Sequence, residues 1–390
     1  MKKNVLHKIM LTTFLLIFSL NSYTQNNSES EIPEPFRGSD ETSKISINYD
    51  DLNYILGASV LDIGKSDRRL APRITPKIGT LFKNSRNNLT AYEGNRFYFK
   101  GLLQPENKAI IKNIRKGIES VASEIAINKL NRKEQLAYWL NLYNITLIEQ
   151  ILDHYPKSKI GNLLHDEDDG LLNKKYLNVA GINLSLNDIH HKIVIPKFKD
   201  DLVVMYGFFQ GIIGGPNIRD EAYSGASVFA QLDDNASEFI NSNRGTYSPS
   251  KGVLYVSKFY EINKQLFPDF QAYLRQHLEY YLDDEYYQHM KDTKSLVASI
   301  KDNSIADLMG GHRSYGGSVS DNQAALIGSV TGGGSDNEAI NWDSVASEII
   351  AKSRTHDRYH PDVENLLKEL KYKSRVRTGT VTIKQGEEKE

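Results

Sequence analysis

The 390-residue sequence contains no cysteine. This absence excludes disulfide bonds, thiolate metal sites, a cysteine nucleophile and a lipid anchor on an N-terminal cysteine. An excess of charge of one sign is also lacking, because 48 basic and 49 acidic residues give a formal charge of −1. Such a balance creates no field to attract nucleic acid, so we expect no nucleic-acid partner. The length allows one large domain or two smaller ones.

The first residues have the pattern of a secretory signal peptide. A basic start with three lysines precedes an apolar run over residues 9–20, and small or polar residues follow it. This run is too short to span a bilayer, which needs about 20 apolar residues. We therefore predict a signal peptide over residues 1–24 and an exported mature protein, periplasmic or extracellular. We expect that it is not a lipoprotein and has no transmembrane segment.

Composition divides the mature chain into four parts. Residues 25–48 are rich in Asn, Ser, Glu and Pro, which predicts a disordered leader. Residues 49–300 carry regular apolar patterns and are expected to form one globular domain. Residues 301–340 are rich in glycine and predict a flexible segment, whereas residues 341–390 predict a small C-terminal element.

Helical spacing of apolar residues dominates the globular domain. The longest such pattern begins at Asn131, a candidate N-cap with Glu134 as its capping-box partner, and ends at Tyr155-Pro156. Further patterns predict helices over 49–61, 109–127, 227–243 and 271–287, a hairpin over 177–184, and strands over 202–209 and 252–256. We therefore predict an α+β fold, a mainly helical domain with a small mixed or antiparallel sheet.

Two asparagines interrupt the apolar face of the longest predicted helix. Asn141 and Asn144 fall among aliphatic side chains such as Ile148, and a buried amide without partners costs about 1–3 kcal/mol. In one interpretation the two amides orient a catalytic or ligand-binding group. In the other they bond the backbone of neighbouring loops and fix the fold, which is the commoner arrangement of buried polar groups.

Two adjacent histidines lie in a short predicted helix that opens with a second capping box, Ser185 with Asp188. Neighbouring helical side chains point about 100° apart, so His190 and His191 do not suit one metal ion. His191 could act as a general base, because the pKa of histidine is near neutrality, or it could be a hydrogen-bonded residue at a helix edge. The glycines at 211–215 lack the spacing of a phosphate-binding loop, and we expect no cofactor and no metal.

Three motifs follow one another along the chain: AYWLNLYN at 137–144, AGINLSLNDIHH at 180–191 and GGPNIR at 214–219. In this order they resemble the signature of the domain-of-unknown-function 547 family, and the resemblance covers about residues 130–275. Cysteines are common in that family at two positions that align with Gln210 and Gly215 here.

The missing cysteines bear on catalysis. A combination of cysteine, asparagine and histidine resembles papain-like or transglutaminase-like enzymes, in which a histidine activates the sulfur. Neither glutamine nor glycine can act as a nucleophile. The resemblance therefore implies a family member without thiol catalysis, and we favour a protein that is not an enzyme.

Three functions remain open from the sequence. In the first, an exported protein binds a peptide or glycan in the cell envelope, in a groove lined by Trp139, Asn141, Tyr143, Gln210, Pro216 and Arg219. In the second, a hydrolase or transferase uses His191 as general base and Asn144 beside it, with water or a substrate hydroxyl as nucleophile. This enzyme requires His191 within about 3–4 Å of Asn144, Gln210 or a carboxylate in an open pocket. In the third, a structural surface protein contacts a protein partner.

Overall fold

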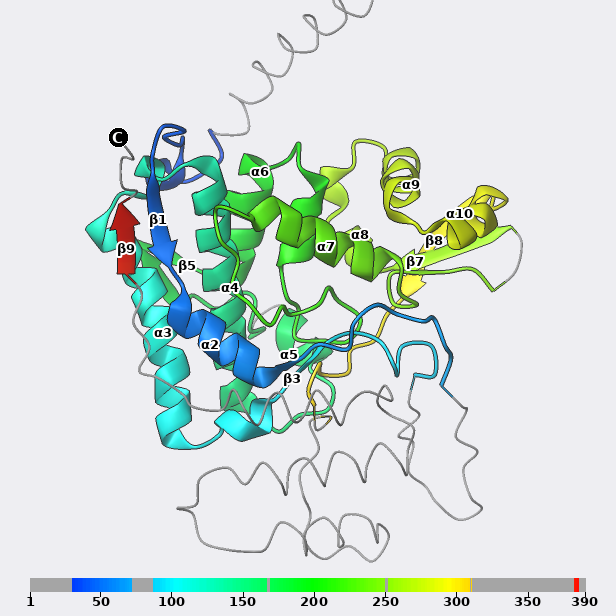
Figure 1. The fold of residues 1–390 in the computed structure, drawn as a ribbon, viewed down its shortest axis with the longest axis horizontal. Coiled ribbons are helices and arrows are strands. Elements are labelled where there is room, and N and C mark those ends of the chain that lie inside the picture. The colour runs from blue at the N-terminus through cyan, green and yellow to red at the C-terminus, as the bar shows by residue number, and fades with distance from the viewer. Residues whose placement is uncertain are drawn as a thin grey trace, which may run out of the picture.

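The computed structural model describes residues 30–71, 87–166, 169–249, 252–308 and 310, and the backbone of 382–385. The predicted signal peptide, most of the glycine-rich segment and most of the C-terminal element lie outside these residues. Helices dominate the described part, and sheets of two or three strands accompany them, which confirms the predicted α+β fold (Figure 1). Among these residues, no helix has both the length and the apolar character that a membrane crossing requires.

The long helix α4 (Arg132–His154) is the centre of the fold. Asn131 caps it as predicted, since its side chain accepts a hydrogen bond from the backbone N–H of Glu134 at 2.9 Å. Instead of completing a capping box, the Glu134 carboxylate accepts from the backbone N–H of Ile47 at 2.8 Å. Glu134 thereby fixes strand β1 (Ile45–Asn48) beside the start of the helix.

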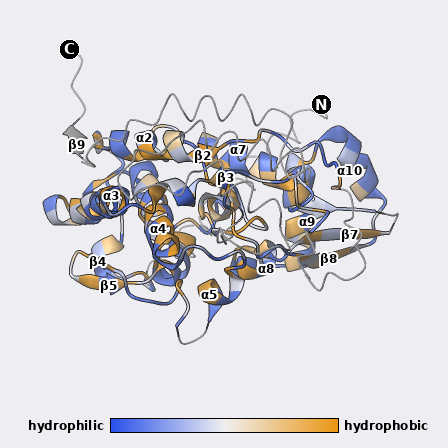
Figure 2. Cartoon of the chain, turned by 90° about the horizontal axis from the view of Figure 1, so that it is seen from below, coloured by the Kyte–Doolittle hydropathy of each residue, from blue (hydrophilic) through white to orange (hydrophobic). Residues whose placement is uncertain are grey.

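Other elements enclose α4 on all sides. Every residue from 134 to 148 is buried, and α3 (Pro105–Glu124) and α7 (Val228–Ile240) pack against the helix. The helix α2 (Asp50–Ser59) contributes Leu52 and Leu56 to the same core. Figure 2 shows α4 largely in hydrophobic colours inside the molecule. A helix enclosed in this way has no free face of its own, so a ligand can reach it only between neighbouring elements.

A second core lies at the end of the molecule opposite α3 (Figure 1). It is built from α9 (Phe270–Tyr281), α10 (Asp284–Lys291) and a mixed three-stranded sheet. In this sheet β6 (Thr246–Tyr247) is antiparallel to β7 (Val253–Ser257), and β8 (Ser295–Ile300) is parallel to β7.

Three further pairs of strands are antiparallel. These pairs are β1 with β9 (Thr382–Gln385), β2 (Val60–Leu61) with β3 (Arg96–Phe97), and β4 (Leu177–Val179) with β5 (Ile182–Leu184). The β4–β5 hairpin confirms the prediction for 177–184. Its turn has positive φ angles at Ala180 (49°) and Gly181 (82°), the conformation that a type I′ hairpin turn requires.

Short helices connect the longer elements. They are the 3-10 helices η1 (Glu34–Phe36), η2 (Phe99–Leu102), η3 (Ile127–Lys129), η5 (Leu202–Gly207) and η6 (Lys264–Leu266), the π-helix η4 (Asp188–Val194), and the α-helices α5 (Gly161–His165), α6 (Ile195–Lys197) and α8 (Phe259–Ile262).

Part of the predicted disordered leader, residues 25–48, is ordered. Ile32 and Phe36 are completely buried, and the Phe36 ring lies edge-on to Trp139 with centroids 4.9 Å apart. The Lys197 ammonium donates to the backbone carbonyl of Phe36 at 2.8 Å. A few apolar anchors and one buried cation thus hold a segment whose polar composition predicts disorder.

The strand predicted over 202–209 is also wrong, because η5 occupies most of this run. An apolar run of this length does not distinguish a buried strand from a buried helical segment. Tertiary contacts decide the matter: Gly207 lies so close to α4 that an added Cβ would be 2.7 Å from the Leu140 side chain. The helix predicted over 271–287 is interrupted, since Leu282 takes an extended backbone between α9 and α10.

Candidate functional site

Asn141 joins α4 to the loop before α7. Its Nδ2 donates to the backbone carbonyl of Tyr223 at 2.8 Å, and its Oδ1 accepts from the N–H of the same residue at 2.9 Å. Both ends of the amide are therefore used on one backbone unit, which fixes that loop against the middle of the helix.

Asn144 holds a second loop in the same manner. Its Nδ2 donates to the carbonyl of Gly207 at 3.0 Å, and its Oδ1 accepts from the N–H of Phe209 at 3.0 Å. The two asparagines are 2% and 8% exposed. This is the arrangement described by the second interpretation of their sequence pattern, in which the amides bond loop backbones.

The two aromatic residues predicted to line the groove lie in the interior. Trp139 is completely buried and packs on Phe36 and Tyr138, while Tyr143 is 2% exposed and lies edge-on to Phe208. The sequence shows no covering element for Trp139, because the N-terminal segment that carries Phe36 has a composition typical of disorder. Neither ring reaches a surface where a ligand could touch it.

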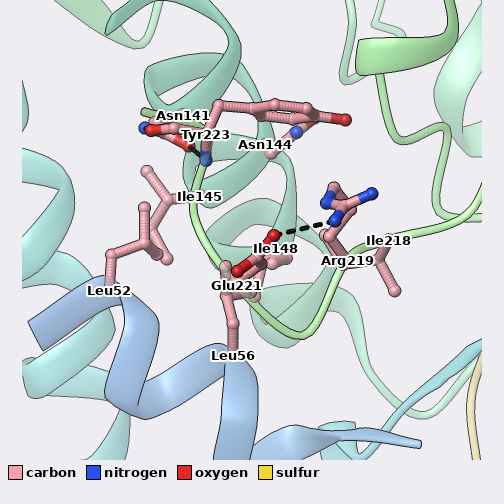
Figure 3. Close-up of a pocket in the computed structure, with 10 residues that line it drawn as sticks. All are labelled: Leu52, Leu56, Asn141, Asn144, Ile145, Ile148, Ile218, Arg219, Glu221 and Tyr223. Carbon is pink, nitrogen blue, oxygen red and sulfur yellow. Dashed lines mark hydrogen bonds and ion pairs between the residues drawn. The ribbon is translucent and has the colours of Figure 1, made fainter. Parts of the chain in front are cut away.

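A small pocket opens where α2, α4 and the loop after Pro216 meet (Figure 3). Its free volume is about 10 Å³, which is space for about one water molecule. Ten residues line it: Leu52, Leu56, Asn141, Asn144, Ile145, Ile148, Ile218, Arg219, Glu221 and Tyr223. Three predicted site residues, Asn141, Asn144 and Arg219, therefore converge on one place. No sequence signal marks the two leucines from α2, whereas Glu221 lies two positions from the arginine of the GGPNIR motif.

The charged groups of the pocket are Arg219 and Glu221. The Arg219 Nη2 donates to Glu221 Oε1 at 2.8 Å, and its Nη1 donates to the Gln231 carbonyl at 3.0 Å and to Asn235 Oδ1 at 3.2 Å. Its Nε is buried and has no hydrogen-bond partner. Burial by itself would raise the pKa of Glu221, but hydrogen bonds from Gln231 and Arg219 lower it below its usual value, so the pair is ionised at neutral pH.

The histidine pair lies elsewhere, on the π-helix η4. His190 is buried, its Nε2 is 2.9 Å from Asn263 Oδ1, and its ring stacks between Phe208 and His191. The partly exposed His191 has its Nδ1 3.0 Å from Gln265 Nε2. Among the side chains that the structure places, neither Asn144, Gln210 nor a carboxylate is hydrogen-bonded to His191. The hydrogen bond that His191 makes here is therefore to Gln265 and not to a partner that the general-base hypothesis names.

Acid is expected to destabilise the protein through His190. Burial, with a smaller effect of His191, lowers the pKa of His190 from 6.5 to about 3. Below about pH 6.5, His190 therefore binds a proton in the unfolded chain but not in the folded protein. The free energy of unfolding falls as the pH decreases. From pH 7.5 to pH 5 this residue should contribute a loss of about 2 kcal/mol in unfolding free energy. Urea unfolding of the wild type and of His190→Gln at both pH values isolates this contribution, and an equal loss in both proteins would refute it.

The two positions that align with family cysteines face each other. A Cβ built on Gly215 would lie 3.0 Å from the Cβ of Gln210, slightly closer than the roughly 3.5–4.5 Å found in disulfides. Gln210 is 9% exposed, and Pro216 in the same loop is buried. Thiols at these positions would therefore contact one another in the interior, and neither lies in the pocket.

This geometry predicts that a Gln210→Cys/Gly215→Cys variant forms a disulfide. Because the wild type has no cysteine, a thiol titration of the folded variant reports this bond alone. We expect no free thiol after oxidation and, since the closed loop is short, a gain of about 2 kcal/mol at most. Two titratable thiols in a folded, oxidised sample would contradict the facing arrangement.

The described residues contain no group of three His, Asp or Glu side chains that could hold a metal ion. The Asp188 carboxylate on η4, for example, is already neutralised by neighbouring lysines. Burial would raise its pKa, but Lys175, Ser185 and Lys192 surround it and hold the pKa well below the usual range. The Ser185–Asp188 capping box is confirmed, with the Ser185 N–H donating to Asp188 Oδ2 at 2.7 Å. This carboxylate thus orders the start of η4.

Comparison with known proteins finds one family model that matches the centre of the fold. Residues 127–240 match the family model described as "Protein of unknown function, DUF547". No curated protein and no solved structure matched the chain. The matched span includes α4, η4, η5, α7 and the loop of Arg219 and Glu221, whereas α2 lies before it. Residues 127–240 of this chain are therefore similar to the DUF547 family, here in a form without cysteine.

Proposed function

We propose that the protein is an exported, non-catalytic binding protein of the cell envelope, whose ligand places one small group at the pocket between α2 and α4. The observation that carries this proposal is the convergence of Asn141, Asn144 and Arg219 on that pocket. These residues come from two motifs that are far apart in the sequence, and the fold brings them together around one opening (Figure 3). The basic and apolar start of the chain supports export.

The lining of the pocket favours binding over catalysis. Five of its ten residues are aliphatic and come from α2, α4 and the 216–223 loop, and both amides are occupied with loop backbone. The one hydroxyl in the lining belongs to Tyr223, and burial raises its pKa above the ordinary value. A phenol in this state is not a nucleophile at neutral pH. The pocket thus has an apolar wall with the Arg219 cation at its edge.

The apolar wall of the pocket suits a peptide better than a glycan. Sugar hydroxyls in contact with Leu52, Ile145 and Ile148 would lose hydrogen bonds to water without replacing them. A small aliphatic side chain meets the same walls without this loss. Of the two ligand classes that the sequence leaves open, the peptide is therefore the one that we propose.

Peptide binding can be tested with a matched pair of variants. The probes are N-acetyl-Ala-Ala and a chitin-type disaccharide, titrated by calorimetry into the mature chain. Leu56→Phe fills the pocket, whereas Leu70→Phe makes the same change at a side chain that is 44% exposed outside the pocket. We expect the wild type and Leu70→Phe to bind the peptide and a folded Leu56→Phe to lose at least tenfold in affinity. Equal binding by Leu56→Phe, or binding of the disaccharide alone, would overturn the proposal.

Export is tested separately in cells. The full chain should appear in the envelope or medium with an N-terminus near Gln25, and a chain starting after residue 24 should stay in the cytoplasm. An uncleaved N-terminus on protein that remains in the cytoplasm would remove this part of the proposal.

A further inference from the structure

We infer that the ligand presents a carboxylate, which takes the place that Glu221 now holds on Arg219. This inference rests on the proposed peptide binding and adds the chemical group by which the ligand is recognised. It comes from the three guanidinium nitrogens of Arg219, which are used unequally although the whole group is fixed at the pocket.

The Arg219 guanidinium is held by hydrogen bonds through Nη1, whereas on its other edge one of two nitrogens has no hydrogen-bond partner. Nη1 donates to the Gln231 carbonyl at 3.0 Å and to Asn235 Oδ1 at 3.2 Å, which fixes the plane of the group. Nε and Nη2 lie side by side on the other edge, which matches the two oxygens of a carboxylate. Here Nη2 carries a single bond to Glu221 Oε1 at 2.8 Å, and Nε is buried without a hydrogen-bond partner. The edge therefore offers an unused donor, Nε, to a carboxylate that makes two bonds.

The Glu221 side chain can leave Arg219 at a small energetic cost. Its side chain is 51% exposed, against 16% for Arg219, so it can turn into solvent without burying a charge. Exposed ion pairs of this kind contribute little to stability. The same Oε1 that accepts from Arg219 also accepts from Gln231 Nε2 at 2.9 Å, and the bond to the arginine is monodentate. Glu221 thus competes weakly with the ligand carboxylate for Arg219, and a carboxylate that makes two hydrogen bonds can displace it.

The surroundings specify what accompanies the carboxylate. Ile148 and Ile218 line the pocket together with Arg219, so an aliphatic group can lie beside the ion pair. With Glu221 in place the free volume is about 10 Å³, which limits this group to a small one. A peptide C-terminus has these two features next to each other, a free carboxylate and the side chain of the last residue. The proposed ligand is therefore a peptide that ends in a small aliphatic residue such as alanine.

Paired probes and paired variants test this inference. N-acetyl-Ala-Ala and its C-terminal amide are titrated into the mature wild type, Glu221→Gln, Arg219→Gln and Arg219→Lys, with circular dichroism to establish folding. We expect the acid to bind at least tenfold more tightly than the amide. Glu221→Gln should bind the acid about five- to tenfold more tightly, since its competing charge is gone. Arg219→Gln should lose the preference for the acid, and Arg219→Lys should lose most of it, because an ammonium cannot bind both oxygens in the fork geometry.

The outcomes separate this inference from the proposed function. If acid and amide bind equally and Leu56→Phe weakens both, the pocket binds peptides but the carboxylate inference is wrong. If Glu221→Gln binds the acid no better than the wild type, Glu221 does not compete for Arg219. If neither probe binds at millimolar concentration, both the proposed function and this inference fail.

Discussion

Replacing Arg244 by leucine is expected to lower the free energy of unfolding by about 3–5 kcal/mol, the range for removing one partner of a buried ion pair. The Arg244 side chain is 1% exposed and is ion-paired with Glu238. Its Nη1 also donates to the backbone carbonyl of Gly215 at 2.9 Å. Leucine would leave that carbonyl and the carboxylate without their donor. Chemical denaturation at neutral pH measures the loss.

The pH dependence of this loss distinguishes a charge effect from a cavity effect. Burial raises the pKa of Glu238 to about 7, although Arg244 holds it lower than burial alone would. Without Arg244 the folded-state pKa would rise further, so the gap between wild type and variant should widen from pH 5 to pH 8. Arg69→Leu is the matched control, because Arg69 is 52% exposed and 3.8 Å from Asp67; we expect its effect to be below about 0.5 kcal/mol. A loss for Arg244→Leu that is the same at both pH values would show that lost packing, and not the buried charge, is responsible.

Replacing Asn144 by leucine should destabilise the protein by about 2–5 kcal/mol, with little change in side-chain volume. The substitution leaves the Gly207 carbonyl and the Phe209 N–H in the interior without the amide that now bonds both. Each such group costs about 1–3 kcal/mol. Thermal or urea unfolding measures this directly. Asn178→Leu is the control, because Asn178 is exposed and hydrogen-bonds Asn183 within the β4–β5 hairpin.

This experiment also separates the two interpretations of the signature asparagines. If Asn144 orients a reacting or bound group, the variant should lose that activity while its stability stays close to that of the wild type. If it fixes the backbone of the 207–209 segment, the free energy of unfolding should fall. An unchanged midpoint of unfolding for Asn144→Leu would contradict this backbone-fixing role.

Local chemistry makes some elements predictable. The Asn131 cap, the Ser185–Asp188 capping box and the turn at Ala180-Gly181 each depend on a few neighbouring residues. The sequence also locates two polar side chains on an apolar helical face, Asn141 and Asn144, since their spacing is a property of the helix alone.

Long-range contacts account for the errors. Residues 30–48 are ordered because Ile32 and Phe36 pack into a core built from much later residues, and no local sequence pattern predicts this. The same contact covers Trp139, which the sequence pattern assigns to a groove. The segment 202–209 is not a strand, since its backbone is bonded by Asn144 from a distant helix. The pocket is predictable only in part, because its motif residues are recognisable, while the wall from α2 depends on how the chain packs.

Methyl NMR of the mature protein tests most directly whether the ligand binds at the pocket between α2 and α4. With N-acetyl-Ala-Ala as probe, we expect the largest shifts at Leu52, Leu56 and Ile148, which line the pocket. The methyl groups of Ile193, on the π-helix that carries the histidine pair, should remain unchanged. Shifts centred on Ile193 and the His191 ring, with Leu52 and Leu56 unaffected, would contradict the proposal and move the binding site to the histidines.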